Sequence, residues 1–461
     1  MATSARQRGI PKTDHTSKEP PENQSEALNA IIEDEFVTEI QRSAWICVIG
    51  SFLFLMPSFG FIQSVGTVQA YLQENQLEQY PARDIGWITG VYTFLTMFLG
   101  IQTGPLVDVF GTTYLALLAA ACTVPMFFLL VEYKVYWHFI LCLGVLGGIG
   151  NAFSTTIGIA VIGKIFHRRR GLAMGIALAG SSTGSIVFPL DLRQIFPMWG
   201  WGWSMRALGF IVLGIMLLGM ACLSPFSRLV SKAQDDTRSI GLSKKSAAMD
   251  FSAFRSGPFS LITGAIFLLE FVIFGATAIL PTLVAWAGFP VESGYNMVAI
   301  LNGLSSLGRI LPGLVGGHVG HFNILLVMVL FTLISTAATL TVFGSSRIEA
   351  LYAFSALWGF GTGSVLSLTP GTTNFVISFS LLLTMPISGQ MLDSLGSTAL
   401  SGLHLVVVFI GGLLIFAARS TLVGSWFNFA SKIWRSRSVY QHWRFTVMIY
   451  NWMSYYLIEL L

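Results

Sequence analysis

The chain has 461 residues, of which 54% are hydrophobic and only 10% are charged, and its formal net charge is +4. Soluble proteins carry about 25% charged residues, so this composition excludes an ordinary soluble domain. A helix needs about 20 apolar residues to cross a bilayer, and roughly a dozen such runs are present. Barrel strands alternate apolar and polar residues, whereas these runs are continuously apolar. The sequence predicts an all-α membrane protein.

The apolar runs fall into two sets between polar segments. Residues 1–43 have the composition of a disordered tail, which we expect on the cytosolic side. The N-terminal half, residues 44–225, is predicted to contain spans at 44–71, 85–107, 112–131, 136–162, 171–192 and 203–224. A cytosolic linker at residues 226–257 precedes the C-terminal half, residues 258–419, with spans at 259–286, 295–317, 323–344, 350–369, 372–392 and 401–418. A cytosolic tail at residues 420–461 completes the predicted organisation of twelve transmembrane helices.

Basic residues set the predicted orientation, because they favour the cytosolic side of a membrane protein. With the N-terminus inside, the inner connections hold Lys164, Arg168, Arg169, Arg170, Arg228, Lys232, Arg238, Lys244, Lys245 and Arg255. The outer connections hold fewer, namely Arg83, Lys134, Arg193, Arg206 and Arg347. We therefore expect both termini in the cytosol, and we expect the membrane to be the plasma membrane.

A repeated spacing indicates that the two sets are duplicates. Gly104, Asp108 and Gly111 close the second span, and Gly313-x-x-x-Gly317-x-x-Gly320 closes the eighth span at the same spacing. Two six-helix halves related by an axis along the membrane normal are typical of many secondary transporters. The repeat predicts this pseudo-symmetric architecture.

Arg309 lies inside an apolar run, where a charge costs at least about 2.5–3.5 kcal/mol. Asn302, Ser305, Ser306 and Arg309 share one helical face at i, i+3, i+4 and i+7. A guanidinium group binds a carboxylate bidentately, so this stripe is a candidate binding site for an anionic solute. The alternative is a structural ion pair between Arg309 and Glu270. Glu270 is in turn either a proton carrier or the partner of Arg309.

Two other predicted spans carry polar stripes. Gln63 lies on such a stripe in the first span, and Asn151 lies on one in the fourth. Both are candidate solute contacts. Small polar side chains at this spacing also serve helix packing, which is the alternative for each of them.

Several motifs resemble known transporters. The segment from Gly104 to Gly111 resembles the loop signature of the major facilitator superfamily. Other passages resemble the fungal branch of the monocarboxylate-transporter-like family, namely AWICVIGSF at Ala44, FHRRRGLAMGIALAGSSTGSIVFP at Phe166, GWSMRALGF at Gly202, GRILPG at Gly308 and WGFGTGSVLSLTP at Trp358. The resemblance implies alternating-access transport of small organic acids, often coupled to protons in animal members. Fungal relatives are also associated with riboflavin uptake and with secondary-metabolite gene clusters.

The resemblance further implies roles for particular residues. The first, fourth, seventh and tenth helices line the cavity in this superfamily, which favours Gln63 as a solute contact. Basic residues near the signature loop latch one conformational state, which suggests that Asp108 pairs with Arg168, Arg169 or Arg170. The alternative is that these arginines serve only to anchor the topology.

The sequence also departs from the family pattern. Val109, Thr112 and Thr113 replace the basic residues of the signature. Gln63 replaces a lysine and Ser305 replaces an aspartate that animal members use for substrate and proton handling, so proton coupling stays open. The chain turns directly at Pro370-Gly371, where fungal relatives have a longer polar loop.

These observations predict a gradient-driven transporter of a small organic acid or of a carboxylate-bearing fungal metabolite. The alternatives are an exporter of an uncharged secondary metabolite, or a transporter-like or truncated product that moves no solute. The sequence contains no P-loop, catalytic triad or metal-ligand motif, so we expect neither an enzyme nor a bound cofactor or metal. The expected partners are a solute, the lipid bilayer and, as an open question, protons. Nucleic acid is not expected, and the oligomeric state is not indicated.

Overall fold

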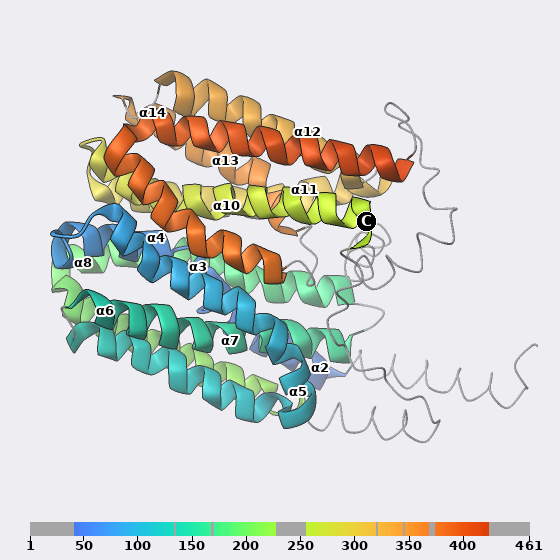
Figure 1. The fold of residues 1–461 in the computed structure, drawn as a ribbon. Coiled ribbons are helices and arrows are strands. Elements are labelled where there is room, and N and C mark those ends of the chain that lie inside the picture. Colours follow the sequence, from blue (N-terminus) through green and yellow to red (C-terminus); the bar gives the residue numbers. More distant parts are fainter. Residues whose placement is uncertain are drawn as a thin grey trace, which may run out of the picture.

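The chain folds into a bundle of long helices in a computed structural model (Figure 1). The structure describes residues 41–132, 135–166, 170–226, 255–319, 321–343, 346–367 and 374–423. No strand occurs in these ranges. Within them, 7 helical stretches are long and apolar enough to cross a membrane. The predicted all-α membrane class is confirmed.

The described helices form two groups along the chain. The first group, here called the N-terminal helices, comprises α2 (Arg42–Leu55), α3 (Phe59–Ile62), α4 (Val65–Tyr71), η1 (Leu72–Gln76), α5 (Ala82–Glu132), α6 (Tyr136–Phe139), η2 (Ile140–Gly147), α7 (Gly148–Ile165) and α8 (Arg170–Leu223). The second group, the C-terminal helices, comprises α10 (Gly257–Trp286), α11 (Val291–Val319), α12 (His321–Thr336), η4 (Ala337–Thr341), α13 (Ile348–Ser367) and α14 (Asn374–Val423). Most of the predicted tails and linker, and the turn at residues 370–371, lie outside the described residues, although α2 begins at Arg42 and α14 continues to Val423.

Single glycines reverse the three longest helices. α5 turns at Gly111 (φ 75°, ψ 171°), α8 at Gly200 (φ 66°, ψ −179°) and α14 at Gly396 (φ 80°, ψ −179°). This backbone conformation is essentially restricted to glycine. The sequence predicted longer connections around Gly200 and Gly396, but the helices continue up to each glycine because one residue suffices to reverse the chain. The reversals of α8 and α5 lie at opposite ends of the bundle, at left and right in Figure 1, and we name these the Gly200 end and the Gly111 end.

The first predicted span, residues 44–71, is not one continuous helix. It breaks after Leu55 and again after Ile62, which leaves α2, α3 and α4 as separate pieces. Pro57 has no N–H for the helical ladder and its ring disrupts the preceding turn. The Ser64 hydroxyl donates to the carbonyl of Gly60 (2.8 Å) at the second break. Pro57 signals the first break in the sequence, which the predicted span at residues 44–71 did not take into account.

Close contacts through small residues pair the helices in the same way in both groups. In the N-terminal helices, Gly180 of α8 packs on the carbonyl of Phe52 in α2, and Gly148 of α7 packs on Leu95 in α5. In the C-terminal helices, the hydroxyl of Ser380 in α14 donates to the carbonyl of Phe267 in α10 (2.8 Å). Gly308 of α11 likewise packs on the carbonyl of Phe360 in α13. Small residues let membrane helices approach closely, and Gly180 is such a residue between α8 and α2.

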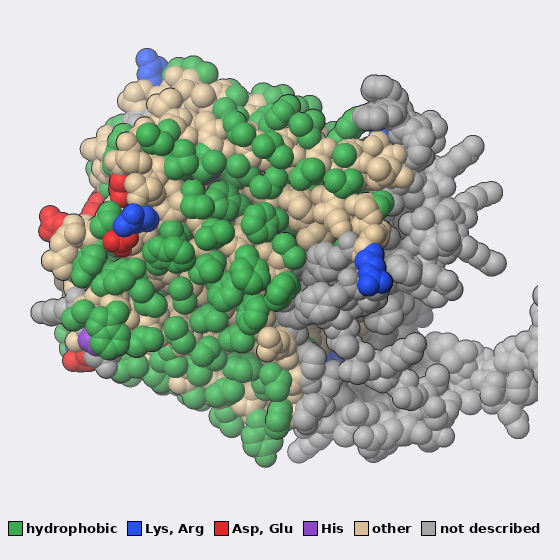
Figure 2. Space-filling view, in the orientation of Figure 1, with side chains coloured by type: hydrophobic (Ala, Val, Ile, Leu, Met, Phe, Trp, Pro, Cys, Tyr) green, Lys and Arg blue, Asp and Glu red, His purple; other side chains and the backbone are tan. Residues whose placement is uncertain are grey.

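The outer surface of the bundle suits a lipid environment. Figure 2 shows hydrophobic side chains over the visible face, with acidic side chains at the Gly200 end and basic side chains at both ends. The exposed apolar residues include Leu117, Leu118, Phe210, Leu217, Leu218, Val327, Leu330, Ile334, Phe409 and Leu413. Exposed tryptophans cluster near the Gly200 end, namely Trp137, Trp199, Trp203 and Trp286. Tryptophan is enriched at membrane–water interfaces, so this belt marks one boundary of the bilayer.

The reversal at Gly200 gives a stability prediction. Gly200→Ala should lower the free energy of unfolding by about 1–3 kcal/mol, because alanine is strained in this conformation. Gly214→Ala, in the same helix, should be neutral or stabilising, because Gly214 is helical. A Cβ atom would meet nothing within 4 Å at either position, so the two variants differ only in backbone conformation. Thermal unfolding of the purified protein in detergent compares them, and equal transition temperatures would contradict the assigned reversal.

Candidate functional site

The N- and C-terminal helices touch closely where α5 meets α14 near the Gly200 end. A Cβ atom added at Gly86 would lie 2.7 Å from the carbonyl carbon of Met385, nearer than real Cβ atoms come. The Asp393 carboxylate accepts a hydrogen bond from the backbone N–H of Ala82 (2.8 Å). A carboxylate at the start of a helix is favoured by the helix dipole. This end of the interface is therefore closed by backbone contact.

Bulkier side chains take the place of Gly86 further along the same two helices. The ring centroids of Phe94 and Phe379 are 5.5 Å apart, and those of Phe98 and Phe375 are 5.8 Å apart. Aromatic rings keep two backbones farther apart than glycines do. The contact between α5 and α14 is thus tighter at the Gly200 end and becomes wider toward the Gly111 end.

Asn302 of α11 joins the two groups of helices by hydrogen bonds. Its amide nitrogen donates to the backbone carbonyls of Gln63 and Ser185, each at 3.3 Å. Asn302 is buried, with 3% of its surface exposed. One amide group of the C-terminal helices therefore binds two separate segments of the N-terminal helices.

Both carbonyls are available because their own helices leave them without an N–H donor. At the break of the first span, the N–H of Thr67 bonds to Ser64 instead of Gln63. In α8, the residue four positions after Ser185 is Pro189, which has no N–H. A buried carbonyl without a donor costs about 1–3 kcal/mol. The Asn302 amide satisfies both at once.

Two further members of the predicted α11 stripe follow Asn302 toward the Gly111 end. Ser305 is buried, and its hydroxyl has no hydrogen-bond partner among the described residues. Arg309 is partly buried and lies about 10 Å beyond Asn302 along the helix axis. Gly363 of α13 packs on the backbone of this segment. The stripe therefore runs from the closed contact into the wider part of the bundle.

The predicted site residues outside the α11 stripe, namely Gln63, Asn151 and Glu270, lie in different parts of the bundle. The Gln63 carbonyl meets Asn302, so these two predicted residues are brought together. Asn151 is buried among the N-terminal helices, where its amide nitrogen donates to the Thr96 hydroxyl (3.1 Å). This bond joins α7 to α5, which is the packing role weighed from the sequence. Glu270 is buried in α10, with 2% of its surface exposed.

The predicted conformational latch is described only in part. Asp108 lies in the helical backbone of α5 and Arg170 begins α8, but their side chains are outside the described part of the structure. Arg168 and Arg169 also lie outside the described residues. The pairing of Asp108 with these arginines stays a prediction.

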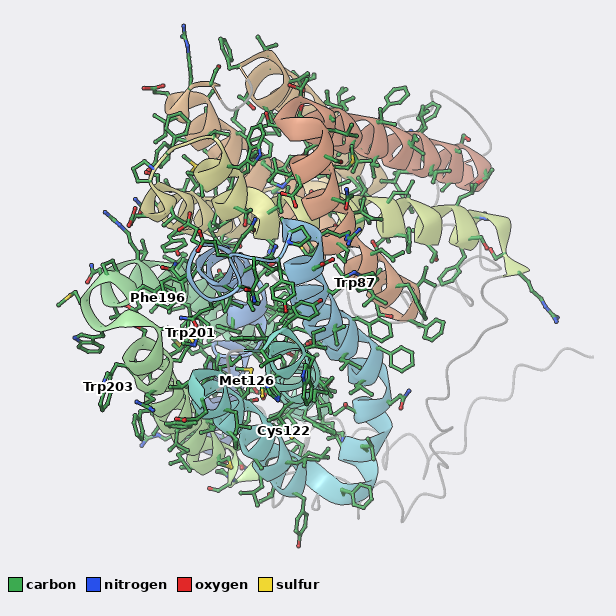
Figure 3. All side chains as sticks on the ribbon, turned by 60° about the vertical axis from the view of Figure 1, so that its left-hand side comes forward. Trp87, Cys122, Met126, Phe196, Trp201 and Trp203 are labelled. Carbon is green, nitrogen blue, oxygen red and sulfur yellow. The ribbon has the colours of Figure 1, made fainter. Side chains whose placement is uncertain are left out.

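Sequence reasoning missed an aromatic cluster at the Gly200 end. Tyr71 stacks on Phe196 with a centroid distance of 4.0 Å and on Trp201 with a distance of 5.4 Å. Figure 3 shows Phe196 and Trp201 close together, with Trp203 pointing away from the bundle. In the sequence, only the position of Tyr71, Phe196 and Trp201 near the ends of apolar runs could have indicated this cluster. Their contact depends on the reversal at Gly200.

Comparisons with known proteins agree with this geometry. The family model described as Major Facilitator Superfamily matches residues 44–378. The aspyridones efflux protein apdF of Emericella nidulans is 29% identical over 395 residues, covering 82% of this chain and 77% of that protein. The riboflavin transporter MCH5 of Saccharomyces cerevisiae is 27% identical over 448 residues, covering 88% and 85%. The crystal structure of tetrameric PepTSo2 superposes with a TM-score of 0.60 at 12% identity, covering 83% of this chain and 99% of that one.

The Asn302 contact yields a double-mutant prediction. Asn302→Ala should lower the transition temperature, because it leaves the Gln63 and Ser185 carbonyls without a donor. Pro189→Ala supplies an N–H that can bond to the Ser185 carbonyl within α8. The cost of Asn302→Ala should then be smaller in the Pro189→Ala background, with a coupling energy of about 0.5–3 kcal/mol.

Thermal unfolding of the four proteins in the cycle measures this coupling. Ser306→Ala is the matched control on the same helix, because the Ser306 hydroxyl bonds only locally to the Asn302 carbonyl (3.0 Å). It should have little effect in either background. Strict additivity of Asn302→Ala and Pro189→Ala would contradict the role assigned to the freed carbonyl.

Proposed function

Because this chain belongs to the Major Facilitator Superfamily and is a multi-pass membrane protein, we propose that it moves a small solute by gradient-driven alternating access. Twelve membrane-spanning helices in two pseudo-symmetric halves form the working unit, with residues 44–225 and 258–419 as the halves. The glycine reversals of α5, α8 and α14 support this division, since each one turns a helix too long for a single span. The matching helix pairs in the two groups support it as well.

The interface between the halves supports a rocking mechanism. Backbone contacts close it at the Gly200 end, and aromatic rings space it toward the Gly111 end. A cycle must break the Asn302 and Asp393 contacts to open the Gly200 end. We propose that this end faces outward and that both termini lie in the cytosol of a cell that carries the protein in its plasma membrane. The predicted excess of basic residues on the inner side supports that orientation.

The α11 stripe carries the proposal for the solute. Arg309 is the charged member of the stripe, and a guanidinium matches the geometry of a carboxylate. The Ser305 hydroxyl, buried without a partner among the described residues, offers a neighbouring hydrogen bond. We propose that a small organic acid or a carboxylate-bearing fungal metabolite binds along this stripe. The subfamily of monocarboxylate-transporter-like proteins suggested by the motifs is consistent with such a solute.

A second candidate is export of an uncharged metabolite. A small cavity between the two groups of helices is lined by apolar and hydroxyl-bearing residues, including Ile62, Val65, Phe274, Thr277 and Met385. The name of the aspyridones efflux protein also favours export of a secondary metabolite. Arg309 would then stabilise the fold and would not bind the solute.

Uptake of a panel of radiolabelled monocarboxylates into proteoliposomes tests the solute class. Arg309→Lys should weaken apparent affinity about 10- to 100-fold, because losing a charged hydrogen bond costs about 1.5–3 kcal/mol. Arg347→Lys is the control, because Arg347 is exposed. Uptake that is equal in the wild type and the Arg309 variant would favour the uncharged metabolite, and no uptake of any solute would favour a non-transporting protein.

Glu270→Gln tests proton coupling in the same assay. If Glu270 carries the coupled proton, the variant should no longer respond to an imposed pH gradient, because glutamine cannot release a proton. Uptake with and without the gradient measures the response. A variant that keeps the full wild-type response would exclude Glu270 as the proton carrier.

A further inference from the structure

A cavity of about 250 Å³ lies at the Gly200 end, apart from the α11 stripe. Its walls come from both groups of helices. The lining residues are Tyr71, Glu74, Asn75, Arg193, Phe196, Pro197, Val291, Glu292 and Tyr295. Pockets for small molecules usually measure about 300–1,000 Å³, so this cavity suits a ligand with a single ring.

The inner wall of the cavity is aromatic. The rings of Tyr71 and Phe196 stack at 4.0 Å, and Phe196 meets Tyr295 at 6.4 Å with an interplanar angle of 60°. The face of an aromatic ring carries negative electrostatic potential and attracts cations. The wall therefore favours a ligand that combines an apolar ring with a positive charge.

Two carboxylates from opposite groups of helices lie at the same cavity. Glu74 comes from η1 and Glu292 from the start of α11. Glu74 is exposed to solvent on one side, and partial desolvation at the cavity, with the charge of Glu292 nearby, raises the pKa of its carboxyl. The carboxylates therefore repel each other across the interface, and a cation placed between them would relieve that repulsion.

The Tyr295 hydroxyl supplies independent evidence for a ligand. Tyr295 is 2% exposed, and its hydroxyl has no hydrogen-bond partner among the described residues. Tyr295 lines the same cavity as Glu74 and Glu292. Buried polar groups in native proteins are nearly always hydrogen-bonded. A ligand group that donates to the phenolic oxygen would satisfy this one.

Arg193 is the basic residue among those lining the cavity, and its charge acts against a cation. Its guanidinium donates to the side-chain oxygen of Asn296 (2.9 Å), which holds the group at one wall. The two carboxylates leave the cavity with a net negative charge despite Arg193. The net charge of the cavity is therefore opposite in sign to the positive charge of Arg309 on the α11 stripe.

We propose that this cavity binds a small organic cation, namely a protonated amine that carries one aromatic or apolar ring. The ammonium group lies between Glu74 and Glu292 and donates to the Tyr295 hydroxyl, while the ring packs on Tyr71 and Phe196. Because the two carboxylates belong to opposite groups of helices, the bound amine holds the Gly200 end closed. This inference does not depend on the solute proposed for Arg309.

Isothermal titration of the full-length protein in detergent, with phenethylammonium as the probe, tests the proposal. Phenethylammonium should bind, whereas 2-phenylethanol and phenylacetate should bind at least about tenfold more weakly to this cavity. Glu74→Gln and Glu292→Gln should each weaken amine binding about tenfold, since each removes a charged hydrogen bond. Arg193→Gln should strengthen binding, which general damage to the fold would not do.

Two control variants show whether the amine binds at this cavity. Glu78→Gln removes an exposed carboxylate from the same connection, outside the cavity lining, and should leave amine binding unchanged. Arg309→Lys should also leave amine binding unchanged, so failure of the carboxylate hypothesis would not affect this result. The proposal is overturned if the amine does not bind, if Glu78→Gln weakens binding as much as Glu74→Gln and Glu292→Gln, or if phenylacetate binds and Arg193→Gln abolishes its binding.

Discussion

The closed arrangement depends on the two hydrogen bonds donated by the Asn302 amide. They end on the carbonyls of Gln63 and Ser185, which the first span and α8 cannot satisfy themselves. A transporter must separate its halves, so a contact that only filled space would give no preferred closed state. The two carbonyls without an N–H donor provide a preferred closed state. They need a hydrogen-bond donor whenever water is excluded, and they can bond to water when the interface opens. In the proposed cycle, the break after Ile62 and the proline at position 189 would thus take part in closing the interface.

The α5–α14 contact sets the direction of the opening. Gly86 allows the backbones to meet at the Gly200 end, and the Asp393 carboxylate bonds to the first turn of α5 there. Phenylalanine rings separate the same helices farther along. The polar stripe from Asn302 to Arg309 runs from the closed part into the wider part. A solute bound at Arg309 would therefore be reached from the Gly111 end in this conformation.

Much of the fold could be predicted from the sequence, because long apolar runs leave few alternatives in a membrane. The reversals were less visible, since nothing local distinguishes Gly200 and Gly396 from the many packing glycines. Asn302 was predicted on a polar stripe, but its hydrogen-bond partners could not be inferred. They lie 239 and 117 residues away, and both bonds depend on backbone irregularities. Asn151 was proposed as a solute contact because it also lies on a polar stripe. Its amide donates a hydrogen bond to Thr96, which joins α7 to α5.

The central claim is that the Gly200 end opens when the Asn302 contact is lost. Double electron–electron resonance measures that opening as a distance between two spin labels. The labels are attached at Glu78 and Ser394, which are both exposed and lie on opposite groups of helices, in a variant without the four native cysteines. The wild type should show a short distance, with a longer one appearing as a minor population. Asn302→Ala should increase the longer population, because the closed state then leaves two carbonyls unsatisfied. A single, unchanged distance in both proteins would contradict the account.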